Sequence, residues 1–196
     1  MALLRKRKHN RWFLQEVVAP REGDTFVDIG CGPAEILGGL PSLNYVGLDI
    51  SEAYIREASQ RWAGQGQFIG GSVTDWQADP RVRDADIVHI NGVLHHCDDR
   101  VAGELLELSR TALKPGGRLV CYEPVYLRWQ SDFGRRMMGL DRGQHIRTEA
   151  AWKALLAPLE GASTSITADI NRLGYSGIVI EYTRPAVPGS RSGERL

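Results

Sequence analysis

The pattern of apolar and polar positions alternates between short apolar runs and longer segments with helical spacing. The short runs predict five strands, at residues 25–29, 45–48, 67–69, 86–90 and 118–122. Helical spacing predicts intervening helices at residues 34–40, 51–62 and 101–113. Strands separated by helices pair through right-handed crossovers, so the pattern predicts a mostly parallel sheet covered by helices.

Both ends of the chain depart from this alternation. Residues 3–19 have helical spacing and stop before Pro20, which predicts a cap helix within residues 1–20. Helical segments at 127–138 and 148–159 belong to an insertion at 124–160, which we expect on the acceptor side of the site. Two strand-like runs, at 162–168 and 177–182, have only a short loop between them, so they predict an antiparallel hairpin.

The predicted fold class is therefore α/β, a three-layer sandwich with a mostly parallel seven-stranded sheet that ends in an antiparallel hairpin. A length of 196 residues suits one domain, which we expect at residues 1–184. Residues 185–196 are rich in Pro, Gly and Ser and predict a flexible tail.

Charge and cysteine content narrow the possible partners. The 24 Lys and Arg residues balance 24 Asp and Glu residues, and a neutral chain argues against a dedicated nucleic-acid binder. The basic run at residues 5–11 is either a solvated helix start or a contact for an anionic partner. Cys31, Cys97 and Cys121 lack metal-ligand spacing, and no metal site is expected. No apolar run approaches the ~20 residues of a membrane span, and the N-terminus lacks a secretory pattern, so we expect a cytoplasmic protein.

The segment VDIGCGP, residues 27–33, passes from a predicted strand into a predicted helix. Gly30 and Gly32 permit a tight turn and a close approach of the main chain to a ligand. A dinucleotide fingerprint would place its third glycine at Glu35, so a bound pyrophosphate is disfavoured there. Asp49 ends the next strand, where a carboxylate can bind ribose hydroxyls. The two features favour a nucleoside ligand without a pyrophosphate.

Five segments in order, VDIGCGP, YVGLDIS, FIGGSVTD, DIVHINGVLHH and LKPGGRLV, resemble the class I S-adenosylmethionine-dependent methyltransferase family. The resemblance covers roughly residues 25–123 and implies a Rossmann-like methyltransferase fold. It also implies S-adenosyl-L-methionine as the methyl donor and S-adenosyl-L-homocysteine as the product.

The resemblance further implies a set of cofactor-binding residues, namely Asp28, Gly30, Cys31, Gly32, Asp49, Ile50, Ser72, Val73 and Asn91. In the family, the glycine turn contacts the methionine part, the acid at Asp49 binds the ribose, and Ile50 lies beside the adenine. Main-chain groups near Asn91 hold the amino group. Ser72 stands where the family often has Asp, so Asp75 either substitutes for it or caps a helix.

Transfer to oxygen or nitrogen requires removal of a proton, and histidine is the usual base. His96 and His145 are the candidate bases, although His95 and His96 also suit a structural or pocket role. His89 alternates with apolar residues inside a strand and is expected to be a buried, hydrogen-bonded core residue. Tyr126 and Arg147 are candidate acceptor contacts, where Arg147 either clamps an anionic group or caps a helix.

The sequence thus predicts an S-adenosylmethionine-dependent methyltransferase that acts on O or N of a small-molecule acceptor such as a metabolite, a sugar or a natural product. Methylation of RNA or protein is an alternative, although Asn91-Gly92-Val93-Leu94 lacks the proline pair that amine methylation of nucleic acids often uses. A non-catalytic S-adenosylmethionine-binding protein is a further alternative. No membrane partner is expected, and the sequence leaves the oligomeric state open.

Overall fold

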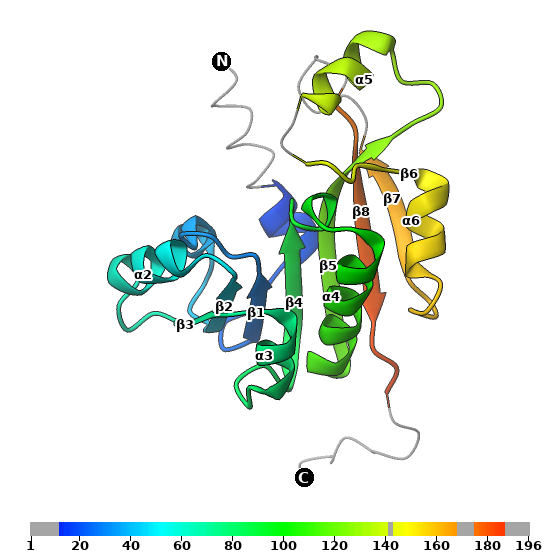
Figure 1. Ribbon diagram of the computed structural model, residues 1–196. Coiled ribbons are helices and arrows are strands. Elements are labelled where there is room, and N and C mark those ends of the chain that lie inside the picture. Colours follow the sequence, from blue (N-terminus) through cyan, green and yellow to red (C-terminus); the bar gives the residue numbers. More distant parts are fainter. Residues whose placement is uncertain (1–11, 141–142, 168–174, 187–196) are drawn as a thin grey trace.

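A computed structural model describes residues 12–140, 143–167 and 175–186. Its centre is a sheet whose main strands follow the order β3-β2-β1-β4-β5-β8-β7 (Figure 1). The bounds are β1 Thr25–Ile29, β2 Asn44–Asp49, β3 Gln67–Gly70, β4 Ala85–Asn91, β5 Leu113–Tyr126, β7 Ser163–Thr167 and β8 Gly177–Thr183. The first five strands in chain order pair in parallel, whereas β8 runs antiparallel to both β5 and β7. The predicted sheet with its terminal hairpin is confirmed.

Helices cover both faces of this sheet. They are α2 Glu52–Arg61, α3 Val73–Ala78, α4 Asp99–Ala112, α5 Asp132–Gly139 and α6 Glu149–Leu156, with a π-helix η1 at Phe13–Val18 and 3₁₀ turns η2 at Glu35–Gly39 and η3 at Leu94–His96. Successive strand residues face opposite sides, so Phe26 packs in one apolar cluster with η1 and α2 residues and Val27 in the other with α3, α4 and α6 residues. The three predicted layers are confirmed.

Several predicted boundaries were wrong. Residues 114–117, between the helix expected at 101–113 and the strand expected at 118–122, belong to β5, where the pairing register shifts between Ala85↔Leu113 and Ile87↔Arg118 in a bulge. The helix expected at 127–138 begins only at Asp132, where the side chain of the N-cap Ser131 accepts a hydrogen bond from the main-chain N–H of Gly134. The strand expected at 118–122 extends to Tyr126, because β8 and the two-residue strand β6, Arg147–Thr148, pair with it. The segment expected as a helix at 34–40 is the five-residue 3₁₀ turn η2.

Some predictions lie partly outside the described residues. Residues 1–11 of the expected cap helix are not described. The described part contains the π-helix η1, which ends at Val18 and is followed by the C-cap Ala19 with a positive φ of 42°. The hairpin loop at 168–174 and most of the expected tail, at 187–196, are likewise outside. Among the described residues, no helix combines the length and apolar character needed to cross a membrane.

Strand order and pairing place the candidate site. The order reverses direction between β1 and β4, and ligands in such sheets bind beyond the carboxyl ends of the strands at that point. Asp28 of β1 pairs in register with His89 of β4, so their side chains lie on the same face. The loop after β2 begins at the same edge, with Ser51 as the N-cap of α2, as predicted.

Candidate active site

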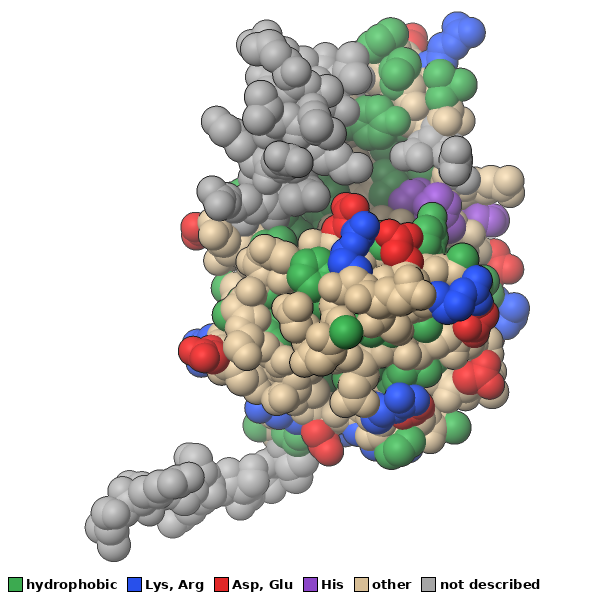
Figure 2. All heavy atoms as spheres, turned by 90° about the vertical axis from the view of Figure 1, so that its left-hand side faces the viewer, with side chains coloured by type: hydrophobic (Ala, Val, Ile, Leu, Met, Phe, Trp, Pro, Cys, Tyr) green, Lys and Arg blue, Asp and Glu red, His purple; other side chains and the backbone are tan. Residues whose placement is uncertain are grey.

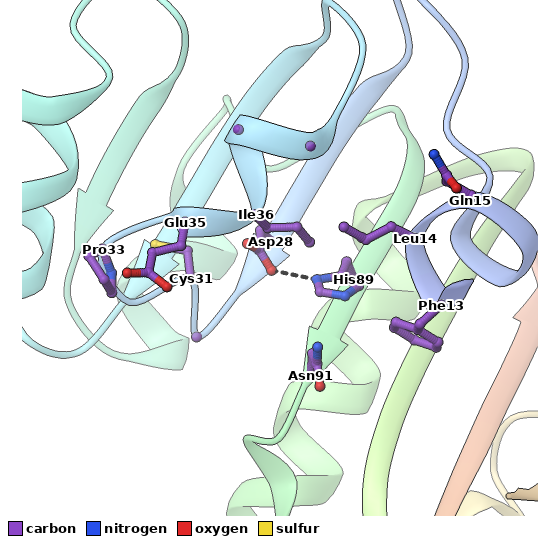
Figure 3. A pocket seen from close by; sticks show the side chains of 13 residues that line it. Phe13, Leu14, Gln15, Asp28, Cys31, Pro33, Glu35, Ile36, His89 and Asn91 are labelled. Carbon is purple, nitrogen blue, oxygen red and sulfur yellow. Dashed lines mark hydrogen bonds and ion pairs between the residues drawn. The ribbon is translucent and has the colours of Figure 1, made fainter. Parts of the chain in front are cut away.

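A cavity of about 690 Å³ opens at the carboxyl ends of β1 and β4 (Figure 3). Its walls come from η1, β1 and the loop that follows it, η2, and β4. Four of the expected cofactor residues line it, namely Asp28, Gly30, Cys31 and Asn91. The other five lie outside this cavity, beyond the ends of β1, β2 and β3, and are Gly32, Asp49, Ile50, Ser72 and Val73.

The two glycines after β1 serve different purposes. Both have positive φ angles, 73° at Gly30 and 53° at Gly32, which glycine adopts most readily. A Cβ atom on Gly30 would lie 2.3 Å from a methyl carbon of Val93, so this glycine permits close packing against the turn after β4. A Cβ atom on Gly32 would meet no atom of the described residues within 4 Å. The open space for a ligand therefore lies beside Gly32.

Asp49 joins the loops that follow β1 and β2. Its Oδ2 accepts a hydrogen bond from the main-chain N–H of Gly32 at 2.9 Å, and its Oδ1 accepts one from Ser51 at 2.8 Å. Each carboxylate oxygen retains a further lone pair for another donor. Ile50 beside it is 79% exposed, which leaves an apolar surface next to the carboxylate. A carboxylate fixed in this way suits a ligand that presents hydroxyl groups.

Buried polar groups form a network at the base of the cavity. Asp28, only 4% exposed, accepts hydrogen bonds from the hydroxyl of Tyr45 at 2.5 Å and from Nδ1 of His89 at 2.7 Å. Burial, followed by the adjacent Asp28 carboxylate, raises the pKa of Tyr45 well above its ordinary value. Tyr45 therefore remains a hydrogen-bond donor at neutral pH. His89 is buried and hydrogen-bonded, as predicted, but it also lines the cavity.

The described lining of the cavity contains the buried carboxylate of Asp28 and the exposed carboxylate of Glu35, with no Lys or Arg side chain among these residues. The Arg61 guanidinium lies 3.6 Å from the Glu35 carboxylate and offsets its charge, so the buried negative charge of the cavity is that of Asp28. Burial is the largest cause that raises the pKa of the Cys31 thiol, and the Asp28 and Asp49 carboxylates raise the pKa further. Cys31 thus stays protonated, and the cavity favours a ligand group that carries positive charge.

At the end of β3, the expected adenine-edge residues are held by a local cap. Asp75 Oδ2 accepts hydrogen bonds from both the main-chain N–H and the hydroxyl of Ser72, at 2.8 and 2.7 Å. These bonds lower the pKa of Asp75. The cap interpretation of Asp75 is confirmed, and Ser72 keeps an oxygen lone pair with which to accept a hydrogen bond.

Glu123 organises the turn after β4, a role that the sequence did not reveal. Its buried carboxylate accepts main-chain hydrogen bonds from Val93, Leu94 and His95, at 2.8, 2.8 and 3.2 Å, and a side-chain bond from His95 Nδ1 at 2.7 Å. The one sequence signal is an acid inside the apolar strand that precedes Pro124. Glu123 therefore fixes both Val93, which packs on Gly30, and the ring of His95.

The structure brings the two candidate bases to one edge of the molecule. His96 and His145 are both exposed, and the main-chain N–H of His145 donates to the carbonyl of His95 at 2.9 Å. The rings of His95 and His96 lie 4.0 Å apart between centroids. Figure 2 shows histidine side chains together at the surface, between the body that holds the sheet and the end of the molecule that carries α5.

The two residues expected to contact the acceptor, Arg147 and Tyr126, differ in whether their side chains are accessible to a ligand. Arg147 is 6% exposed, and its guanidinium donates to Asp99 and to the carbonyls of Leu94, Cys97 and His145. These bonds fasten the segment around β6 to the turn after β4, so the geometry favours a structural role for Arg147 over an anion clamp. Tyr126 is half-buried at the end of β5, with the Arg135 guanidinium 5.5 Å from its ring centre.

No cluster of three or more His, Cys, Asp or Glu side chains with the geometry of a metal site occurs within the described part of the chain. The described acids and histidines of the site are instead engaged in pairs, as Asp28 with His89 and Glu123 with His95.

Comparisons with known proteins find similarity to methyltransferases. Residues 27–119 match a family model described as a methyltransferase domain. The ubiquinone/menaquinone biosynthesis C-methyltransferase UbiE of Acidiphilium cryptum (strain JF-5) is 34% identical over 144 residues, which cover 62% of this chain and 55% of that protein. A match to an uncharacterised 37.1 kDa protein in a transposon of Streptomyces fradiae covers 31% of that protein. The chain thus spans about a third to a half of the length of these curated relatives.

Solved structures share the fold at low sequence identity. The N-methyltransferase NodS from Bradyrhizobium japonicum WM9, in complex with S-adenosyl-L-homocysteine, has a TM-score of 0.63 and 15% identity over 92% of this chain and 88% of that chain. The mitomycin 7-O-methyltransferase MmcR has a TM-score of 0.65 and 22% identity over 92% of this chain and 56% of that chain. These similarities concern the arrangement of the sheet and its helices.

Proposed function

Residues 27–119 match a family model described as a methyltransferase domain, and we propose that the chain is a class I S-adenosylmethionine-dependent methyltransferase that methylates an oxygen or nitrogen atom of a small-molecule acceptor. The observation that carries this proposal is the Asp49 carboxylate, which the main chain of Gly32 holds beside the open side of the glycine turn. A negatively charged cavity adjoins this arrangement and suits a cofactor that carries a sulfonium and an ammonium group.

The cofactor supplies an activated methyl group when it is bound. In the proposed site, Asp28, Gly30, Cys31 and Gly32 surround its methionine part. Asp49 accepts hydrogen bonds from its ribose hydroxyls, and an apolar contact from Ile50 and polar contacts from Ser72 and Val73 hold its adenine. The main chain at Asn91 holds the amino group. Positioning of the two reactants can lower the barrier by about 7–11 kcal/mol.

The acceptor enters, in this proposal, from the side that carries His96, His145 and Tyr126. Either exposed histidine takes the acceptor proton at a ring nitrogen, which is the only proton transfer that methylation of O or N requires. The names of the fold neighbours, a 7-O-methyltransferase and an N-methyltransferase, support acceptors of this kind. The relative named a C-methyltransferase favours a carbon atom as a second candidate acceptor. An acceptor screen should therefore contain phenols, amines and quinols.

Thermal unfolding with S-adenosylhomocysteine, beside NAD and NADP, tests the cofactor assignment. A ligand at 100 times its dissociation constant adds about 2.7 kcal/mol to the free energy of unfolding. At this chain length that corresponds to a rise in Tm of roughly 5–10 °C. We expect this rise with S-adenosylhomocysteine alone. A rise with NADP and none with S-adenosylhomocysteine would refute the proposal.

Substitution of Gly32 with alanine tests the ligand side of the glycine turn. The added methyl group projects into the open space, and overpacking of this kind costs about 1–3 kcal/mol, or roughly tenfold in affinity for S-adenosylhomocysteine. Isothermal titration calorimetry measures the effect. Gly161 is the matched control, because it also has a positive φ, 84°, and open space around it, but lies between α6 and β7. If G32A and G161A bound S-adenosylhomocysteine equally well, the ligand would not bind beside this turn.

A further inference from the structure

One buried histidine in the cavity is fixed in orientation by its neighbours. His89 is 2% exposed, and its Nδ1 lies 2.7 Å from Asp28 Oδ1, while Asp28 Oδ2 accepts a second hydrogen bond from Tyr45. Because the carboxylate acts as the acceptor of both bonds, Nδ1 of His89 carries the hydrogen. In the neutral imidazole, the other ring nitrogen, Nε2, presents a lone pair and is a hydrogen-bond acceptor.

This acceptor atom has no partner within the protein. Nε2 of His89 is buried, and the described residues provide no hydrogen bond to it. The rings of Phe13 and Phe26 lie 6.0 and 5.6 Å from the imidazole between centroids, and neither ring carries a conventional donor. In Figure 3, His89 lies between Asp28 and Phe13 in the same cavity as Asn91. A buried polar atom without a partner is unfavourable, so the site is complete only with a donor opposite Nε2.

The chemistry of the cavity identifies the donor. The buried Asp28 carboxylate makes this part of the described lining negative, since the exposed Glu35 pairs with Arg61. Burial, together with the Asp28 and Asp49 carboxylates, raises the pKa of the Cys31 thiol in the same wall. A carboxylate group of a ligand would be repelled there, both by these charges and by the lone pair of Nε2. A positively charged group with N–H bonds satisfies the lone pair and the negative surroundings together.

On the premise of the proposed function, we propose that Nε2 of His89 accepts a hydrogen bond from the ammonium group of the cofactor's amino-acid end, with Asp28 and Tyr45 holding the imidazole in place. This assignment makes His89 a binding residue for the cofactor and distinguishes it from a core histidine. It also gives the buried Asp28 an indirect part in cofactor binding, through the ring that it orients.

A pair of variants and a pair of ligands test the assignment by isothermal titration calorimetry. In H89N, the amide N–H can still donate to Asp28, but the shorter side chain has no atom at the position of Nε2. In H89Q, the longer side chain places its amide group at that position. The ligands are S-adenosylhomocysteine and its desamino analogue, which has hydrogen in place of the ammonium. We expect H89N to lose roughly tenfold or more in affinity for S-adenosylhomocysteine, because a bond to a charged group is lost. Its affinity for the analogue should stay within about twofold of the wild-type value, and H89Q should recover most of the loss.

Two controls separate this contact from general damage to the site. Y45F removes one of the two hydrogen bonds that hold Asp28 and leaves Nε2 of His89 in place, so we expect it to lose less affinity for S-adenosylhomocysteine than H89N does and to bind the desamino analogue as the wild-type protein does. If H89N does not fold, H89L is measured with the same two ligands, since an apolar side chain is compatible with the adjacent Phe13 and Phe26.

The outcomes that overturn the inference are distinct from failure of the proposed function. An equal loss of affinity for both ligands would make His89 a structural residue. If H89N bound both ligands with unchanged affinity, the contact between Nε2 of His89 and the ammonium group would be excluded. If its kcat were reduced at the same time, the imidazole would act on the acceptor and not on the cofactor. Absence of S-adenosylhomocysteine binding by the wild-type protein would refute the proposed function itself.

Discussion

Replacement of Asp49 with asparagine should lower the affinity for S-adenosylhomocysteine by roughly 100-fold or more. Hydrogen bonds to a charged group contribute about 1.5–3 kcal/mol each, and the proposed ribose contact contains two of them. The substitution also sets an amide N–H₂ against the main-chain N–H of Gly32 or of Ser51, because the carboxylate now accepts from both. The loop around the glycine turn should therefore loosen as the ribose contact is lost. Calorimetric titration of D49N with S-adenosylhomocysteine measures the combined effect.

The D86N variant is the matched control for this experiment. Asp86 accepts a hydrogen bond from the main-chain N–H of Thr25 at 3.0 Å and pairs with Lys114, at the amino ends of β1 and β4. It thus shares the carboxylate-to-main-chain contact of Asp49 at the opposite edge of the sheet. We expect D86N to lose stability and to bind S-adenosylhomocysteine as the wild-type protein does. A D49N variant that bound equally well would remove Asp49 from the cofactor site.

The order of strands and helices could be predicted because it depends on local pattern. Short apolar runs at β1, β2 and β4, bounded by glycine or by capping residues such as Ser51, identify buried strands and helix starts without knowledge of their partners. The errors occurred where a distant segment decides the local structure. β5 extends to Tyr126 because β8 and β6 pair with it, and both follow later in the chain.

The candidate site divides in the same way. The glycine turn, Asp49 and the residues that follow β3 and β4 belong to contiguous motifs, so their positions at one edge of the sheet followed from the predicted topology. The buried pairs did not. Glu123 binds a turn 28–30 residues away, and Arg147 binds atoms up to 53 residues away, so neither separation has a sequence signature. The same applies to the open lone pair of His89, which depends on the packing of Phe13 from η1.

Burial also changes what the histidines can do. From sequence, His95 and His96 shared a possible structural or pocket role, and His96 was in addition a candidate base. In the fold, Glu123 holds the buried His95, while His96 remains exposed beside His145. The carboxylate that orders this turn therefore affects cofactor and acceptor sides together, since Val93 of the same turn packs on Gly30.

Substitution of Glu123 with glutamine should be the most destabilising of these changes. The carboxylate is fully buried and accepts five hydrogen bonds, three from the main chain, one from His95 Nδ1 and one from Cys121 Sγ. The glutamine amide keeps one oxygen acceptor, and its N–H₂ then faces the main-chain N–H of His95, which cannot change its role. Loss of a charge-assisted contact with a buried donor left unpaired costs about 2–4 kcal/mol. At this chain length, Tm should fall by roughly 5–15 °C in a thermal unfolding experiment.

Two control variants test whether the loss of stability in E123Q is specific to the buried carboxylate. One removes a charge on the surface, and the other removes a side-chain partner of Glu123. Glu107 pairs with Arg110 on the exposed surface of α4, and E107Q should change the free energy of unfolding by less than about 1 kcal/mol. H95A leaves Glu123 with its three main-chain donors, so it should destabilise the protein less than E123Q does. Because Val93 loses its anchor in E123Q, the affinity for S-adenosylhomocysteine should fall as well, while H95A should largely retain it. An E123Q protein as stable as E107Q would show that the turn after β4 holds its shape without the buried carboxylate.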